Sequence, residues 1–178
     1  MQRFAVALAL CSLALFARPN EANAGGFQLG IDLGVDYALE DLAGIGIGVG
    51  FNPGYEIIDG LAIELNLGLD RFSKDSFRTR LLPLQIGARY RAELDSITPF
   101  GYLHFGPVNV NIKPQGLGIF GAAFSVSNTY IGVNAGGGVE FALNENTGIG
   151  AQVGVSHVFV EREEFTNINV GLVFLLAL

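Results

Sequence analysis

Few side chains in this sequence have the chemistry for catalysis or metal binding. Its two histidines, His104 and His157, lie far apart, and its single cysteine, Cys11, lies in an apolar N-terminal segment. Ser156 directly precedes His157, but neighbours on a strand point to opposite faces and do not easily share a hydrogen bond. The histidines therefore do not favour a metal site or an acid–base pair. We expect no catalytic residue, no metal site and no cofactor.

Acidic and basic residues form a second set, and they recur at alternate positions of several segments. We expect seven of them to share one buried face: Asp32, Asp36, Glu64, Asp70, Arg89, Arg91 and Glu140. Buried charges must be paired or solvated. The favoured interpretation is an ion-pair network that fills the interior, led by Glu64 and Asp70 opposite Arg89 and Arg91. The alternative is a gate or a narrow ion path through the same groups.

The segments that must position these charges alternate in period two. In "AGIGIGVGF", residues 43–51, four glycines alternate with Ile45, Ile47, Val49 and Phe51. Successive side chains of a strand point to opposite faces, so one face is apolar and the other is bare. No segment indicates an amphipathic helix. The pattern predicts eight strands, at about 27–37, 43–51, 61–72, 82–91, 99–110, 130–142, 148–160 and 166–178.

Turn signals separate these strands and set their connectivity. They are "NPG" at 52–54, "DG" at 59–60, "DSITP" at 95–99 and "NENTG" at 144–148. A regular meander of this kind predicts neighbouring antiparallel strands closed into an up-and-down barrel. Eight membrane-crossing strands need about 80 residues, whereas sixteen would need about 160 and leave only about 18 of the 178 residues for the connections. The fold class is therefore all-β, an eight-stranded antiparallel barrel.

The composition of the two faces indicates which solvent surrounds the barrel. A soluble, ligand-carrying barrel would line its interior with the apolar residues and present Lys and Glu to water. Here the face opposite the apolar one consists mostly of Gly, Asn, Gln and Ser. A membrane barrel turns its apolar face to lipid and packs small residues into a narrow lumen. The sequence favours a transmembrane barrel.

The N terminus has the features of a secretory signal. Arg3 is followed by apolar runs that are too short for an ordinary transmembrane helix, and "ANA" at 22–24 has the small residues of a cleavage site. We interpret residues 1–24 as a signal peptide and residues 25–178 as the barrel domain. A lipoprotein reading of Cys11 is not favoured, because Leu10 precedes it. Cleavage would leave no cysteine for disulfides or nucleophiles.

Charge argues against one class of partner. The chain has 17 acidic residues against 10 Lys and Arg, a net charge of −7. Phosphate backbones are bound by clustered basic surfaces, so we expect no nucleic-acid partner. The glycines alternate, which differs from a nucleotide-binding fingerprint at the start of a helix.

The signal segment, the repeated strands and the ending "NVGLVFLLAL" resemble the small outer-membrane β-barrel proteins of Gram-negative bacteria, the OmpA-like and OmpX-like eight-stranded family. The resemblance implies a final strand read by the outer-membrane assembly machinery through Asn169, Gly171, Phe174 and Leu176. The terminal residue, Leu178, departs from the usual aromatic. The implied partners are that machinery, outer-membrane lipid and lipopolysaccharide, with the protein as a monomer and its extracellular partner unknown.

An even number of strands places both termini on one side, which the resemblance assigns to the periplasm. Connections at about 38–42, 72–79, 111–129 and 161–165 are then extracellular, and 52–60 is a long periplasmic connection. The third extracellular connection carries an apolar set that could contact a partner: Leu117, Ile119, Phe120 and Phe124. Alternatively, the fifth and sixth strands extend and pair there.

Two expectations concern the fifth strand. We expect aromatic residues near strand ends, including Phe100 and Tyr102, to form an interfacial girdle. In the same phase, simple alternation would direct His104 at lipid, so a bulge or register shift is predicted there.

Three classes of function remain. The favoured one is a non-enzymatic barrel that contributes to envelope integrity and surface interaction. The second is a narrow channel or a conduit for hydrophobic solutes. The third is a membrane-embedded lipid-modifying enzyme, for which the sequence offers no convincing Ser, His and acid set.

Overall fold

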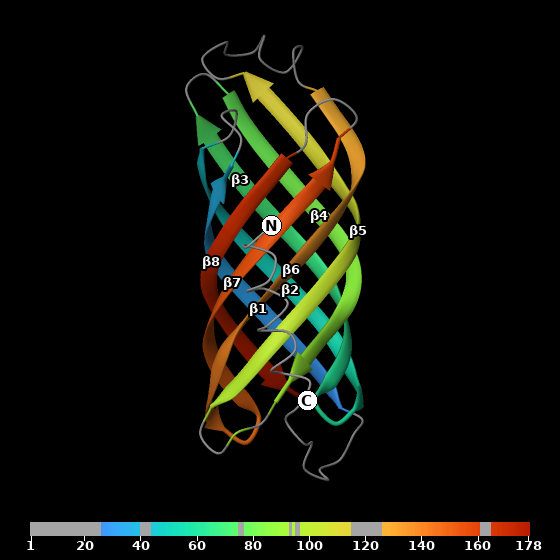
Figure 1. Ribbon diagram of the computed structural model, residues 1–178, viewed down its shortest axis with the longest axis vertical. Coiled ribbons are helices and arrows are strands. Elements are labelled where there is room, and N and C mark those ends of the chain that lie inside the picture. Colours follow the sequence, from blue (N-terminus) through green and yellow to red (C-terminus); the bar gives the residue numbers. More distant parts are fainter. Residues whose placement is uncertain are drawn as a thin grey trace, which may run out of the picture.

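The protein is a closed barrel of eight antiparallel strands, each hydrogen-bonded to its neighbours in chain order (Figure 1). The computed structural model describes residues 26–39, 44–74, 77–92, 94, 97–114, 126–160 and 165–178. The strands are β1 (Phe27–Ala38), β2 (Ile45–Ile58), β3 (Leu61–Lys74), β4 (Phe77–Arg91), β5 (Thr98–Pro114), β6 (Val126–Asn144), β7 (Thr147–Phe159) and β8 (Phe165–Ala177). The predicted fold class and strand number are confirmed. The predicted signal peptide lies outside the described residues.

The barrel has two different ends. One end, which we call the terminal end, carries Phe27 and Ala177 together with the tight turns at 59–60 and 145–146. The opposite end is called the distal end, where β5 and β6 extend furthest along the barrel axis (Figure 1). β1 closes the barrel by pairing with β8, from Gln28 opposite Ala177 to Ala38 opposite Asn167. None of the described residues forms a helix long and apolar enough to cross a membrane.

The period-two pattern has the predicted consequence on β2. Ile45, Ile47, Val49 and Phe51 lie on the outer surface, with 42% to 67% of each side chain exposed. The alternating glycines face the interior because larger side chains of the neighbouring strands occupy that space. A Cβ atom on Gly46 would lie 2.7 Å from the ring of Phe72, and one on Gly50 would lie 3.2 Å from Asp32 Oδ2.

Four strands, β2, β4, β5 and β6, are at least five residues longer than their sequence patterns indicated. The segment 52–60 was expected to be a long connection, but β2 continues to Ile58 and turns at Asp59 and Gly60. The prediction failed because "NPG" is part of the strand here, and its Asn and Gly pack against side chains in the barrel interior. Asn52 is buried and hydrogen-bonded to Asp32. Gly54 leaves room for Glu64, because a Cβ atom on Gly54 would lie only 3.0 Å from the Cβ of Glu64.

Two of the distal connections are likewise shorter than predicted. β3 ends at Lys74 and β4 begins at Phe77, so the connection expected at 72–79 is largely strand. β5 reaches Pro114 and β6 begins at Val126, with Ile112 opposite Val126. The extended-strand alternative is therefore confirmed for these residues. The predicted contact residues Leu117, Ile119, Phe120 and Phe124 lie outside the described residues.

Candidate functional site in the barrel interior

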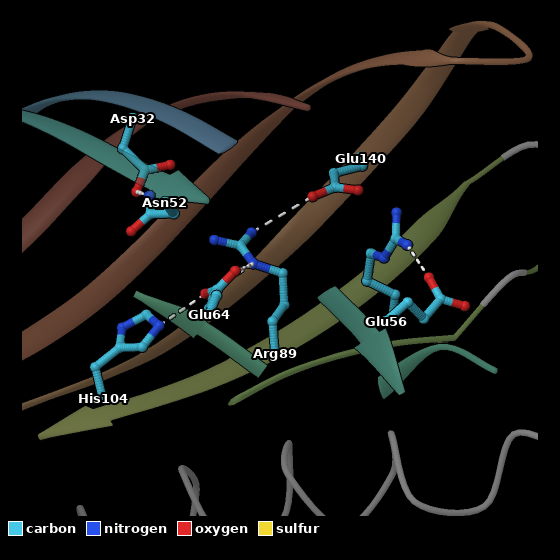
Figure 2. Close-up of polar contacts among 8 residues, drawn as sticks. Asp32, Asn52, Glu56, Glu64, Arg89, His104 and Glu140 are labelled. Carbon is cyan, nitrogen blue, oxygen red and sulfur yellow. Dashed lines mark hydrogen bonds and ion pairs between the residues drawn. The ribbon is translucent and has the colours of Figure 1, made fainter. Parts of the chain in front are cut away.

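Glu64 on β3 is the centre of a buried polar cluster. Arg89 on β4 donates from Nε to Glu64 Oε2 at 3.1 Å and to Oε1 at 3.2 Å. On the other side, His104 Nε2 on β5 lies 2.7 Å from Glu64 Oε1. All three residues are at most 2% exposed. Figure 2 shows Glu64 between the arginine and the histidine, so that one carboxylate ties three strands together.

Arg89 extends this cluster past β5 to β6. Its Nη1 forms an ion pair with Glu140 Oε1 on β6 at 3.5 Å (Figure 2). Its guanidinium carbon also lies 4.7 Å from the ring centre of Phe100 and 5.5 Å from that of Tyr102. A guanidinium is attracted both to carboxylates and to aromatic faces. The side chain of Arg89 thus lies along the inner face of β5 near the terminal end.

Phe100, Tyr102 and His104 form an aromatic ladder along the inner face of β5. The rings of Phe100 and Tyr102 stack at 6.4 Å, and those of Tyr102 and His104 at 5.2 Å. The Tyr102 hydroxyl occupies space opposite Gly136 and Gly154, since a Cβ on either glycine would collide with it. The ladder fills the interior beside Arg89.

The ladder corrects two predictions for β5. Phe100 and Tyr102 do not belong to an interfacial girdle, and no bulge or register shift occurs at His104, which pairs regularly with Gly87 and Asn134. The prediction chose the wrong phase because both faces of this strand are apolar. Leu103 and Phe105, which alternate with the ladder, are the outward residues, at 56% and 61% exposed. The polar His104, in phase with the ladder, was the available signal for the correct choice.

Two of the predicted carboxylates are held by amides. Asn52 Nδ2 donates to Asp32 Oδ2 at 2.6 Å, and Asn167 Nδ2 donates to Asp36 Oδ1 at 3.1 Å. Asp36 and Asn167 are each 1% exposed. The sequence reasoning missed both asparagines because it considered only charged partners, although Asn52 and Asn167 occupy the lumen-facing phase of their strands.

Arg91 and Asp70 lie apart from the Glu64 cluster, contrary to the predicted network. Arg91 Nη2 pairs with Glu56 Oε2 at 2.7 Å at the terminal end, where both side chains remain 15% to 17% exposed. Asp70 is six residues from Glu64 along β3, roughly 20 Å for an extended strand. Asp70 is therefore too far along the barrel to join the Glu64–Arg89 ion pair. Instead, Asp70 Oδ1 and Asp36 Oδ2 lie on either side of Gly48, 2.6 and 2.7 Å from where its Cβ would be.

An apolar cluster closes the distal part of the interior. It consists of buried residues with partly buried residues packed against them: Ala38, Phe72, Leu81, Val108, Val110, Val158, Tyr130, Val160 and Phe165. The rings of Phe72 and Phe165 pack edge to face at 5.4 Å across the lumen. The interior is therefore filled by charged and aromatic groups towards the terminal end and by apolar groups towards the distal end.

A polar cavity of about 50 Å³ lies between these two fillings. Among its lining residues, Asp32, Asp36, Gln152 and Asn169 each present a buried oxygen without a hydrogen-bond partner among the described residues. A polar cavity of this size can hold several water molecules, which would hydrogen-bond to such acceptors. The mid-barrel interior therefore suits water and small cations better than apolar ligands.

The described residues contain no assembled metal site, and His157 contacts residues of its own strand and of β8. No group of three or more His, Cys, Asp and Glu side chains among them is arranged to hold a metal ion. His157 Nδ1 lies 2.9 Å from Thr166 Oγ1, and its ring packs against Phe159 at 4.6 Å. These contacts involve no carboxylate and, as expected from strand alternation, not Ser156.

The residues of the implied assembly signal lie on both faces of β8. Asn169 lines the interior cavity, and Gly171 faces inward against Leu33 and Gly34 of β1. Phe174 and Leu176 face outward, at 36% and 39% exposed.

Comparison with known proteins agrees with this architecture. The family model described as "Outer membrane protein beta-barrel domain" matches residues 4–174. No curated protein matches the sequence significantly. Among solved structures, Neisserial surface protein A is similar with a TM-score of 0.68 and 17% identity, covering 87% of this chain and 99% of that one.

Two further similar structures have different roles. Ail, the attachment invasion locus protein of Yersinia pestis, has a TM-score of 0.55 and 14% identity, covering 86% of this chain and 99% of that one. The outer membrane enzyme PagL has a TM-score of 0.56 and 15% identity, covering 83% and 98%. At these identities the likeness concerns the fold alone. The extent of the family match shows that this chain belongs to the outer-membrane β-barrel domain family and is an integral protein of the bacterial outer membrane.

Proposed function

We propose that the protein is a non-enzymatic outer-membrane barrel that contributes to envelope integrity and to interactions at the cell surface. The observation that supports this proposal is the double filling of the lumen. The Glu64–Arg89–Glu140 group and the aromatic ladder occupy the terminal half, and the cluster around Phe72 occupies the distal half. An eight-stranded barrel has an interior just wide enough for side chains to fill. Such a barrel acts through its outer surface and its ends.

Single-channel recording in planar bilayers tests this function. We expect the refolded wild type to give no conductance steps. The variant Arg89→Ala/Arg91→Ala removes the ion pairs in the terminal half of the lumen but leaves the apolar cluster in the distal half. The variant Phe72→Ala/Arg89→Ala weakens the filling of both halves. We expect steps most readily in the second variant. Well-resolved steps in the wild type would contradict the proposal.

The alternative function is a narrow channel, and one observation favours it. The cavity between the two fillings is lined by acidic and amide oxygens, which would select for cations. Wild-type conductance with a reversal potential that reports cation selectivity would support this alternative. A conduit for hydrophobic solutes is less well supported, since all eight strand pairs are joined and leave no lateral opening in the described wall.

A lipid-modifying enzyme is the remaining alternative, and its only support is that the similar fold of PagL belongs to an outer membrane enzyme. Incubation with phospholipid and lipid A vesicles, followed by mass spectrometry of the lipids, tests it. We expect unchanged acyl chains. Loss or transfer of an acyl chain would overturn the non-enzymatic proposal.

The proposal includes an orientation. Both termini and the turns at 59–60 and 145–146 face the periplasm, and the distal end faces outward. The short turns at one end and the extended β5–β6 hairpin at the other support this assignment, because such barrels have short periplasmic turns and longer extracellular loops.

A further inference from the structure

Four basic side chains gather on the outer surface at the distal end of β3, β4 and β5. They are Arg71, Arg78, Arg80 and Lys113, which we call the basic patch. Arg71, Arg78 and Lys113 are exposed and Arg80 is half-buried. The whole chain has only 10 Lys and Arg and a net charge of −7. Four of these ten basic residues therefore lie together on one part of the surface of a protein whose net charge is negative.

The phase of each strand places these side chains on the lipid-facing side of the barrel. Arg71 lies an even number of residues from the outward Leu65 on β3, and Lys113 from the outward Leu103 on β5. Arg78 and Arg80 share the phase of Leu84, which is 55% exposed on β4. The basic patch therefore projects from the same face that contacts the membrane, and not into the lumen.

The patch sets like charges directly against each other. Arg71 is the cross-strand partner of Arg80, and Arg78 is the partner of Lys113. Like charges directly opposite each other destabilise a sheet. No acidic side chain among the described residues forms an ion pair with any of the four. The repulsion between these like charges destabilises the sheet when nothing is bound, and a bound anion would reduce that repulsion.

The height of the patch along the barrel identifies the surroundings. The outward positions of β4 are apolar or aromatic from Leu82 to Tyr90, a span that suits one membrane crossing, and Arg80 is the next outward residue. On β3 the outward apolar run ends at Leu69, directly before Arg71. Arg78 lies two residues beyond Arg80, roughly 7 Å further along the tilted strand and away from the bilayer centre. The patch thus spans the depth at which lipid headgroups lie.

We propose that the basic patch binds the phosphate groups of the phosphorylated glycolipid that forms the outer leaflet. This inference rests on the proposed orientation, which places the distal end at that leaflet. Arginine presents a planar fork of donors that fits phosphate oxygens in a bidentate manner. The two cross-strand pairs form two tiers, so one headgroup can contact both while its acyl chains lie along the apolar face below. The phosphates would thereby neutralise the repulsion within the sheet.

Binding of a defined probe to the full chain tests the proposal. The protein is refolded in a neutral detergent, and lipid A with two phosphates is titrated and followed by native mass spectrometry. We expect the variant R71Q/R78Q/R80Q/K113Q to bind at least about tenfold more weakly. The control variant S73Q/N111Q changes outward polar residues on the same strands and is expected to bind as the wild type does. Dephosphorylated lipid A is expected to bind the wild type as weakly as lipid A binds the quadruple variant.

Three results would overturn the proposal: equal binding by the quadruple variant, equal binding of dephosphorylated lipid A, or wild-type binding of a heparin fragment in place of lipid A. Misfolding does not confuse the outcome, because the quadruple variant loses two repulsive pairs. Its unfolding midpoint in neutral detergent should therefore equal or exceed that of the wild type. Wild-type conductance would contradict the proposed function without affecting this binding.

Discussion

Arg89 contacts two carboxylates and two aromatic rings in the interior, and its removal should be costly. It is 1% exposed and contacts Glu64, Glu140 and Phe100. Removing one partner of a buried ion pair leaves an uncompensated charge. We expect Arg89→Ala to lower the free energy of unfolding by about 3 kcal/mol or more. Guanidinium titration in detergent micelles, followed by circular dichroism, measures this loss.

Arg91→Ala is the matched control for that measurement. Arg91 also forms an arginine–glutamate pair, with Glu56 at 2.7 Å, but this pair is partly in contact with solvent. Partly exposed pairs contribute less, so we expect a loss of about 1 kcal/mol or less. Equal losses in the two variants would contradict the central role of the buried cluster.

A lumen-facing glycine, Gly138, and an outward-facing one, Gly101, allow a second prediction for single residues. A Cβ on Gly138 would overlap the carbonyl oxygen of Ala151 and lie 2.8 Å from Phe100 Cζ. A Cβ on Gly101 would meet nothing nearer than the carbonyl oxygen of Gly136 at 3.7 Å. We expect Gly138→Ala to destabilise the barrel by about 1–3 kcal/mol, and Gly101→Ala to change stability by less than about 0.5 kcal/mol.

Both glycine variants can be compared in one chemical-unfolding series. The two substitutions add the same methyl group, and the two sites lie in adjoining cross-strand pairs, Phe100 with Gly138 and Gly101 with Gly137. A larger loss for Gly101→Ala would mean that close packing does not explain the alternating glycines.

At the level of the element, β8 carries the implied assembly signal. Phe174 and Leu176 face outward, as do Val170 and Leu172 on the same strand. We expect Phe174→Ala/Leu176→Ala to slow insertion by the purified assembly machinery in proteoliposomes. Val170→Ala/Leu172→Ala removes similar apolar surface outside the signal and should insert at nearly the wild-type rate. Both variants should refold comparably in detergent, where no machinery reads the strand, and equal insertion rates would refute the signal.

At the level of the whole molecule, the proposed orientation makes a prediction for intact cells. Cys11 is the only cysteine and lies in the predicted signal peptide, so introduced cysteines report cleanly. Ser127→Cys, at the distal end, should react with a membrane-impermeant maleimide on intact cells. Asp59→Cys, at the terminal end, should react only after the outer membrane is permeabilised. The reverse pattern would invert the orientation and place the basic patch in the inner leaflet.

The sequence by itself determined the type and number of strands and which solvent each face meets. Alternation is a local property, since each residue of a strand faces the side opposite its neighbour, and most strands here have one clearly apolar face. The sequence also identified the lumen-facing positions of Asp32, Asp36, Glu64, Arg89 and Glu140. It failed for β5, where Leu103 and Tyr102 make the two phases equally apolar.

Only the tertiary structure decided which interior residues meet. Arg89 contacts Glu140, 51 positions later in the chain, because β4 and β6 both pair with β5 and direct these side chains into one narrow lumen. The height at which each side chain enters that lumen depends on the stagger of all eight strands, and no single strand specifies it. For this reason Asp70 and Arg91, which match the charge pattern equally well, lie at other levels. The like-charge pairs of the basic patch also depend on register, which is set when neighbouring strands pair.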